Sequence, residues 1–153
     1  MKHLQPGDSA PKFTGTDQNG ETVKLSDFKG KKLVIYFYPK DNTPGCTVQA
    51  CNLRDNYGLL EKKGISLVGI SGDSVLSHQK FSNKFDLPFP LIADVDHKII
   101  NAYGVWGHKK FMGREYDGIH RTTFLINEKK KIVGIIEKPK TKQHSEEILE
   151  IFK

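Results

Sequence analysis

The stretch LVIYFYPKDNTPGCTVQAC, residues 33–51, decides the fold. It begins with Leu33–Tyr38, a continuous run of aliphatic and aromatic residues whose length suits a buried central strand. Pro39 ends that strand, because proline cannot donate a hydrogen bond to a neighbouring strand. A Pro-Gly pair just before Cys46 suits the start of a helix. The stretch therefore predicts a strand, a loop and a helix, and ligand sites in open α/β sheets lie at such strand-to-helix turns.

The helix after this loop is expected to run from Cys46 to about Lys62. Its apolar positions can share much of one face, which is predicted to be buried: Val48, Cys51, Leu59 and Leu60. Arg54 points elsewhere and is expected to be a charge on the helix surface. The second cysteine would then pack towards the core.

The remaining patterns extend this unit in both directions. Apolar runs predict strands over residues 22–25, 66–71, 91–93, 122–126 and 132–137. Periodic patterns predict helices over residues 74–85, 96–103 and 143–152. Strands that alternate with helices indicate an α/β sheet with helices on both faces, and a final hairpin makes the sheet mixed. The expected fold is α/β and thioredoxin-like, with a central mixed β-sheet flanked by helices, in one domain over residues 1–153.

Length and charge restrict the function classes. A chain of 153 residues can bury a core without a disulfide or a metal. The net charge of +6 permits nucleic-acid binding, but the lysines fall in small groups at expected turns, which favours a solvated surface. The apolar runs are too short to cross a membrane, and the N-terminus has no leader pattern. A cytoplasmic protein without a nucleic-acid or membrane partner is expected. In the cytoplasm two cysteines rarely form a structural disulfide.

Both cysteines of the chain lie in the opening stretch, five residues apart. Cys46 would stand in the first turn of its helix, where unpaired N–H groups act as about half a positive charge. A thiol placed there ionises more readily, and the thiolate is the reactive form. The alternative is that both cysteines are small buried core residues. A reactive role is favoured over this alternative, because both cysteines lie in one segment, Cys46 stands at a helix start and a Pro-Gly turn precedes it.

Several other kinds of site do not fit. The spacing is C-x-x-x-x-C and not the C-x-x-C of thioredoxin-type oxidoreductases. The six histidines are scattered, so no zinc site is expected. Gly69-Ile-Ser-Gly-Asp73 departs from the nucleophile elbow G-x-S-x-G at its last position. Neither a G-x-G-x-x-G nor a Walker sequence occurs. We expect no metal.

Residues 39–46, Pro-Lys-Asp-Asn-Thr-Pro-Gly-Cys, resemble the peroxiredoxin signature P-x-x-x-T/S-x-x-C. Cys46-Thr-Val-Gln-Ala-Cys51 is similar to the peroxiredoxin Q subfamily, also called bacterioferritin comigratory protein, where a second cysteine often lies five residues after the first. Gly104-Val-Trp106 precedes a variable loop in this comparison. Residues 118–126, GIHRTTFLI, resemble the stretch that supplies the active-site arginine of the family, although relatives often carry Glu in place of His120. The resemblance covers nearly the whole chain.

The resemblance implies a thiol-specific peroxidase that reduces hydrogen peroxide and organic hydroperoxides in antioxidant defence. Cys46 would be the peroxidatic nucleophile and Thr43 would bind the peroxide through its hydroxyl. Pro39 would shield the site from water. Arg121 would favour the thiolate and stabilise charge in the transition state. Gln49 matches a substrate-site position that is often Gln or Glu in the family.

The resemblance also implies how the reaction cycle closes. Cys51 would resolve the sulfenic acid of Cys46 as an intrachain disulfide, which thioredoxin or a similar dithiol would reduce. Such a cycle needs no bound cofactor, because sulfur supplies the redox chemistry. The pairing needs no second chain, so a monomer is expected. A redox sensor or disulfide-exchange protein using the same cysteines, and a basic nucleic-acid-binding domain with incidental cysteines, remain as alternatives. Fast peroxide consumption would separate the peroxidase from the redox sensor, whereas a nucleic-acid-binding domain predicts duplex binding with a steep salt dependence.

Overall fold

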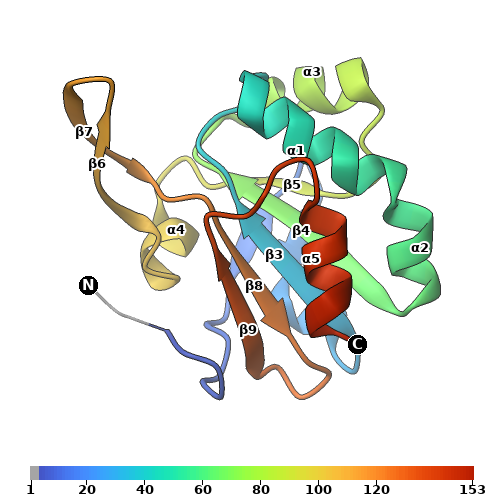
Figure 1. Cartoon of the computed structure of the whole chain (residues 1–153). Coiled ribbons are helices and arrows are strands. Elements are labelled where there is room, and N and C mark those ends of the chain that lie inside the picture. Colours follow the sequence, from blue (N-terminus) through green and yellow to red (C-terminus); the bar gives the residue numbers. More distant parts are fainter. Residues whose placement is uncertain (1–3) are drawn as a thin grey trace.

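A computed structural model describes residues 4–153, and within this range the chain folds around a five-stranded sheet (Figure 1). The strands of the sheet are β3 (Lys32–Phe37), β4 (Ile65–Ser71), β5 (Leu91–Ala93), β8 (Thr122–Ile126) and β9 (Ile132–Glu137). Their spatial order is β5-β4-β3-β8-β9. β3, β4 and β5 run parallel, whereas β8 pairs antiparallel with both β3 and β9. The predicted mixed sheet is confirmed.

Two cores lie on opposite faces of this sheet. The helices are α1 (Pro44–Asp55), α2 (Tyr57–Lys62), α3 (Val75–Phe85), α4 (Lys98–Ala102) and α5 (His144–Ile151). Leu33, Ile35 and Phe37 of β3 pack in one core with α4, whereas Val34 and Tyr36 pack in the other with α1, α2, α3 and α5. This alternation follows from the two-residue period of a strand. None of the helices within residues 4–153 is long and apolar enough to cross a bilayer.

The central helix differs from the prediction in its start, its continuity and its buried face. It begins at Pro44 and breaks at Asn56, so residues 44–62 form two helices. The side chain of Asn56 donates to the carbonyl of Asn52 and so competes with the backbone for this acceptor. Val48 and Leu59, predicted to be buried, are 38% and 44% exposed. The buried positions of α1 are Cys46, Gln49, Ala50 and Leu53, a face that includes a polar residue.

A hairpin of β6 (Trp106–Phe111) and β7 (Arg114–Ile119) projects from the body of the molecule (Figure 1). The sequence predicted only a variable loop here, and that prediction is wrong. Met112 and Gly113 join the strands with φ values of 50° and 79°, which is the geometry of a tight hairpin turn. The strands are mostly exposed, so their sequence lacks the alternation of apolar and polar residues by which a half-buried strand is predicted. The N-terminal pair β1 (Thr14–Thr16) and β2 (Thr22–Lys24) and the short 3-10 helix η1 (Leu25–Phe28) complete the fold.

Candidate active site

The loop between β3 and α1 places Cys46 in the first turn of α1. Thr43 is the N-cap, with extended backbone (φ −92°, ψ 157°), and Pro44 is the first helical residue. The backbone N–H of Thr47 donates to the carbonyl of Thr43 at 2.9 Å and closes this turn. Cys46 is buried, with 2% of its surface exposed. Its own N–H belongs to the groups that the helix leaves unpaired, and these favour negative charge beside them.

Arg121 reaches the sulfur from the segment between β7 and β8. Its Nη2 donates to Sγ of Cys46 at 3.3 Å, and its Nη1 donates to Oε1 of Gln49 at 2.5 Å. Gly45 makes this approach possible, because a Cβ at that position would lie 3.2 Å from Nη2. The guanidinium of Arg121 therefore contacts both the sulfur of Cys46 and the amide of Gln49, as expected if these three residues form one site.

Gln49 continues this hydrogen-bond network into the core. Its Oε1 accepts from Arg121, so its Nε2 donates to Nδ1 of His144, 3.1 Å away. The remaining hydrogen of His144 is then on Nε2, which donates to Oγ1 of Thr123 at 2.8 Å. Burial, and next the charge of Arg121, lower the pKa of His144 to about 3. A neutral His144 therefore holds the Gln49 amide with its oxygen towards Arg121, a role that the sequence did not reveal.

Replacing His144 by Gln should make stability less sensitive to acid. The folded pKa of about 3 lies below the ordinary 6.5, so below pH 6.5 the unfolded chain binds a proton that the folded chain does not. The free energy of unfolding should therefore fall with decreasing pH, by about 1.4 kcal/mol per pH unit from this group. Urea unfolding between pH 6 and pH 4 should show the steeper loss in the wild type. His120→Gln, at an exposed histidine, should keep the wild-type slope. Equal slopes for the wild type and His144→Gln would contradict the assignment.

Lys109 of β6 is a second cation beside the site. Its Nζ donates to the carbonyl of Ile119 at 2.9 Å. Lys109 lines a cavity of about 390 Å³ together with Pro39, and another of about 540 Å³ together with Arg121. Burial and then repulsion by Arg121 lower the pKa of Lys109, whereas Cys46 acts to raise it. The sequence hypothesis missed this residue because the hairpin that carries it was expected to be a loop.

The other predicted residues lie around this centre. The hydroxyl of Thr43 donates to the carbonyl of Lys40 at 2.9 Å, which fixes it on the loop. Pro39 is half-buried in the wall of the smaller cavity. Cys51 lies further along α1 and is half-buried, and both cysteines are free thiols. Five residues of helix rotate the second side chain by a net ~140° from Cys46, so the two thiols point to different sides of α1.

Aromatic rings close the site on its core side. Tyr36 stacks on Tyr38 with ring centroids 5.4 Å apart, and it meets His144 edge-on at 5.9 Å. Its hydroxyl is buried and finds no hydrogen-bond partner among residues 4–153. Burial, followed by the nearby Cys46, raises the pKa of Tyr36, so the phenol stays neutral. Cys46 thus has neutral aromatic packing on the core side and the guanidinium of Arg121 as its charged contact.

Comparisons with known proteins cover the whole chain. The AhpC/TSA family profile matches residues 6–135. Peroxiredoxin Bcp of Escherichia coli (strain K12) is 48% identical over 153 residues, which covers 100% of this chain and 98% of that protein. A mutant PrxQ of Xylella fastidiosa has a TM-score of 0.92 at 32% identity, covering 99% and 97% of the two chains. The bacterioferritin comigratory protein of Xanthomonas campestris, described with an alkyl peroxide reduction activity, has a TM-score of 0.84 at 35% identity, covering 90% and 88%. The predicted thioredoxin-like fold is confirmed by these neighbours.

Proposed function

The chain belongs to the AhpC/TSA family of peroxiredoxins, in its Bcp or peroxiredoxin Q group, and from this premise we propose that Cys46 is the thiol that attacks the peroxide. As a peroxiredoxin it is a thiol peroxidase. The observation that carries the proposal is the 3.3 Å hydrogen bond from Arg121 to the sulfur of Cys46. A guanidinium in this place stabilises the thiolate and then the charge that develops on the leaving oxygen.

The first chemical step is a displacement at oxygen. The thiolate of Cys46 attacks one oxygen of the hydroperoxide, an S–O bond forms and the O–O bond breaks. Cys46 is oxidised by two electrons to the sulfenic acid, and the leaving alkoxide or hydroxide takes up a proton to give an alcohol or water. Thr43 binds the peroxide through its hydroxyl, Pro39 keeps water from the sulfur, and Gln49 holds Arg121 in place.

The second step returns the enzyme to its thiol form. The thiolate of Cys51 attacks the sulfenic sulfur, an S–S bond forms, the S–O bond breaks, and the leaving hydroxide takes up a proton to give water. A dithiol reductant such as thioredoxin then reduces this disulfide by exchange. Both sulfurs belong to one helix of one chain, so the proposal includes a working monomer.

A single-turnover experiment tests the proposal as a whole. Reduced protein is mixed with one equivalent of peroxide in a stopped-flow instrument, and thiols are counted after the reaction. We expect rapid consumption of the peroxide, loss of both thiols and a monomer mass that shows one internal disulfide. Slow consumption would favour a redox sensor. A product linked between chains would contradict Cys51 as the resolving residue of its own chain.

Arg121→Ala should slow the oxidation of Cys46 by peroxide about a hundredfold, the usual effect of removing one charge-stabilising donor. The matched control is Arg54→Ala on α1, because Arg54 binds Asp55 and the carbonyl of Phe85 and not the sulfur. The stopped-flow rate at fixed pH should fall only in the Arg121 variant. A wild-type rate in Arg121→Ala would place the guanidinium outside the reaction.

A further inference from the structure

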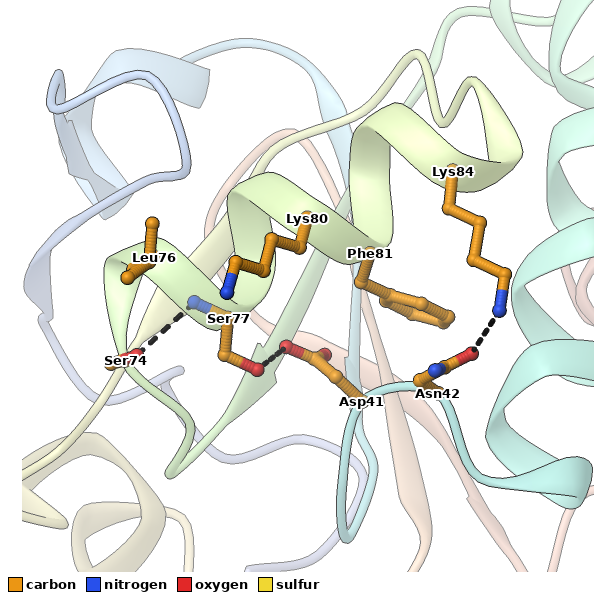
Figure 2. Close-up of a pocket in the computed structure, with 8 residues that line it drawn as sticks. All are labelled: Asp41, Asn42, Ser74, Leu76, Ser77, Lys80, Phe81 and Lys84. Carbon is orange, nitrogen blue, oxygen red and sulfur yellow. Dashed lines mark hydrogen bonds between the residues drawn. The ribbon is translucent and has the colours of Figure 1, made fainter.

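Asp41 ties the loop between β3 and α1 to the rest of the fold. Its buried carboxylate accepts a hydrogen bond from the hydroxyl of Tyr38 at Oδ1, 2.6 Å away, and from Oγ of Ser77 at Oδ2, 2.8 Å away. Figure 2 shows Ser77 pointing from α3 to this carboxylate, at the edge of a pocket of about 340 Å³. The backbone N–H of Asp41 donates to Oδ2 of Asp73 at 2.8 Å. Both the side chain and the backbone of this residue are therefore held.

His78 of α3 completes the anchor and is fully buried. Its Nδ1 lies 2.6 Å from Oδ2 of Asp41, and its Nε2 lies 2.9 Å from the carbonyl oxygen of Ile92. The carbonyl can only accept, so Nε2 donates to it, and one proton lies between Nδ1 and the carboxyl group of Asp41. Two polar side chains are thus buried against each other with their polar atoms hydrogen-bonded. Removing one partner of such a pair leaves a buried polar group without its hydrogen bond.

The same group does not have the character of a metal site. One ligand atom from each of Asp41, Asp73 and His78 lies within 4.8 Å of the others. However, Oδ2 of Asp73 already accepts from Oγ of Ser71 at 2.7 Å and from the N–H of Asp41. A metal would have to displace these donors and the proton that lies between Asp41 and His78. We therefore interpret the group as an internal hydrogen-bonded anchor.

The anchor stands at the centre of the segment that joins β3 to α1, the helix that carries Cys46. Pro39 lies two residues before Asp41 and Thr43 two residues after it. Asn42, which joins the anchor to α1, has a φ of 58°, and its Oδ1 accepts from Nζ of Lys84 at 3.4 Å (Figure 2). A displacement of Asp41 would therefore move the residues on both sides of it.

We propose that the buried, hydrogen-bonded pair of Asp41 and His78 is a positioning element of the peroxide reaction, which holds Pro39 and Thr43 at the geometry that the attack on peroxide requires. This inference rests on the proposed function. A misplacement of about 1 Å can slow a reaction about a hundredfold. Because the anchor precedes α1, it acts on the peroxide step and leaves the later attack by Cys51 unaffected.

The variants Asp41→Asn and His78→Asn test this role. In single-turnover stopped flow, we expect oxidation of Cys46 by peroxide to slow at least about tenfold, since the loop loses its fixed geometry. Alkylation of Cys46 by iodoacetamide requires the thiolate but no bound peroxide, and its rate should stay within about threefold of the wild type. The later phase of disulfide formation should keep its wild-type rate. Equal slowing of alkylation and peroxide oxidation would overturn the proposal.

Two serines at the start of α3 give a milder matched pair of variants that leaves both Asp41 and His78 in place. Oγ of Ser77 donates to Asp41, whereas Oγ of Ser74 accepts from the N–H of Ser77 and caps the helix (Figure 2). Ser77→Ala should slow peroxide oxidation several-fold, and Ser74→Ala should leave it unchanged. Equal rates in these two variants would also overturn the proposal. A wild-type protein that fails to react with peroxide would instead refute the proposed function itself.

Discussion

Cys46→Ser is expected to lower peroxide reduction by at least about a thousandfold, because it removes the nucleophile of the reaction. A serine hydroxyl is not ionised at neutral pH, and its oxygen cannot form the sulfenic acid on which the cycle depends. The smaller atom fits the buried site, and the hydrogen bond from Arg121 to Gln49 does not involve the sulfur. Peroxide consumption with an excess of dithiol reductant measures the effect.

Cys51→Ser is the matched control for this variant. It keeps the sulfur of Cys46 and its contact with Arg121, so the first turnover should proceed at the wild-type rate. The reaction should then stop at the sulfenic acid, which a reagent specific for that group can trap. More than trace turnover in Cys46→Ser, or the loss of the first turnover in Cys51→Ser, would exchange the roles of the two residues.

The parts of the fold that depend on local pattern were predictable. Ser74 was expected to cap α3, and its Oγ accepts from the N–H of Ser77. The predicted bounds 122–126 and 132–137 are those of β8 and β9, where apolar runs flank a lysine-rich turn. The contact of Arg121 with Cys46 joins residues 75 positions apart, and it was anticipated only through a resemblance to known proteins.

The polar residues buried around the site were not predictable. His144 lies 95 positions from Gln49, and His78 lies 37 positions from Asp41. A sequence pattern assigns such polar residues to the surface, because the neighbouring residues do not reveal a hydrogen-bond partner that is distant in sequence and lies in the core. On α1 the polar Gln49 lies on the buried face, whereas the apolar Val48 is partly exposed. A local pattern predicts the opposite for both residues.

The intact helix α1 holds the two thiols too far apart for the proposed disulfide. Both cysteines lie within α1, and five residues of regular helix separate their Cα atoms by ~8.6 Å. A disulfide tolerates at most ~6.8 Å. Gln49 lies between them and is bound to both Arg121 and His144, so unwinding must also release these hydrogen bonds. The disulfide can form only if part of the helix opens.

Asn52 determines where this opening should stop. Its side chain donates to the carbonyl of Lys142 at 3.0 Å and accepts from the N–H of Ser145 at 2.9 Å, which ties the second half of α1 to the start of α5. We therefore expect the opening of α1 to be confined to the residues before Asn52.

Hydrogen exchange in the two redox states should show this opening. Formation of the disulfide should lower amide protection in residues 47–55 by about a hundredfold or more, because those amides donate to the carbonyls of residues 43–51, which leave the helix. The amides of Leu60 and Lys63, which donate to the carbonyls of Asn56 and Leu59 beyond Asn52, should keep most of their protection. Cys51→Ser treated with one equivalent of peroxide is the control, since it is oxidised without forming the disulfide and should keep α1 closed. Equal protection in the reduced and oxidised wild type, with the internal disulfide confirmed by mass, would mean that the bridge closes without unwinding, against the helical geometry of the two thiols.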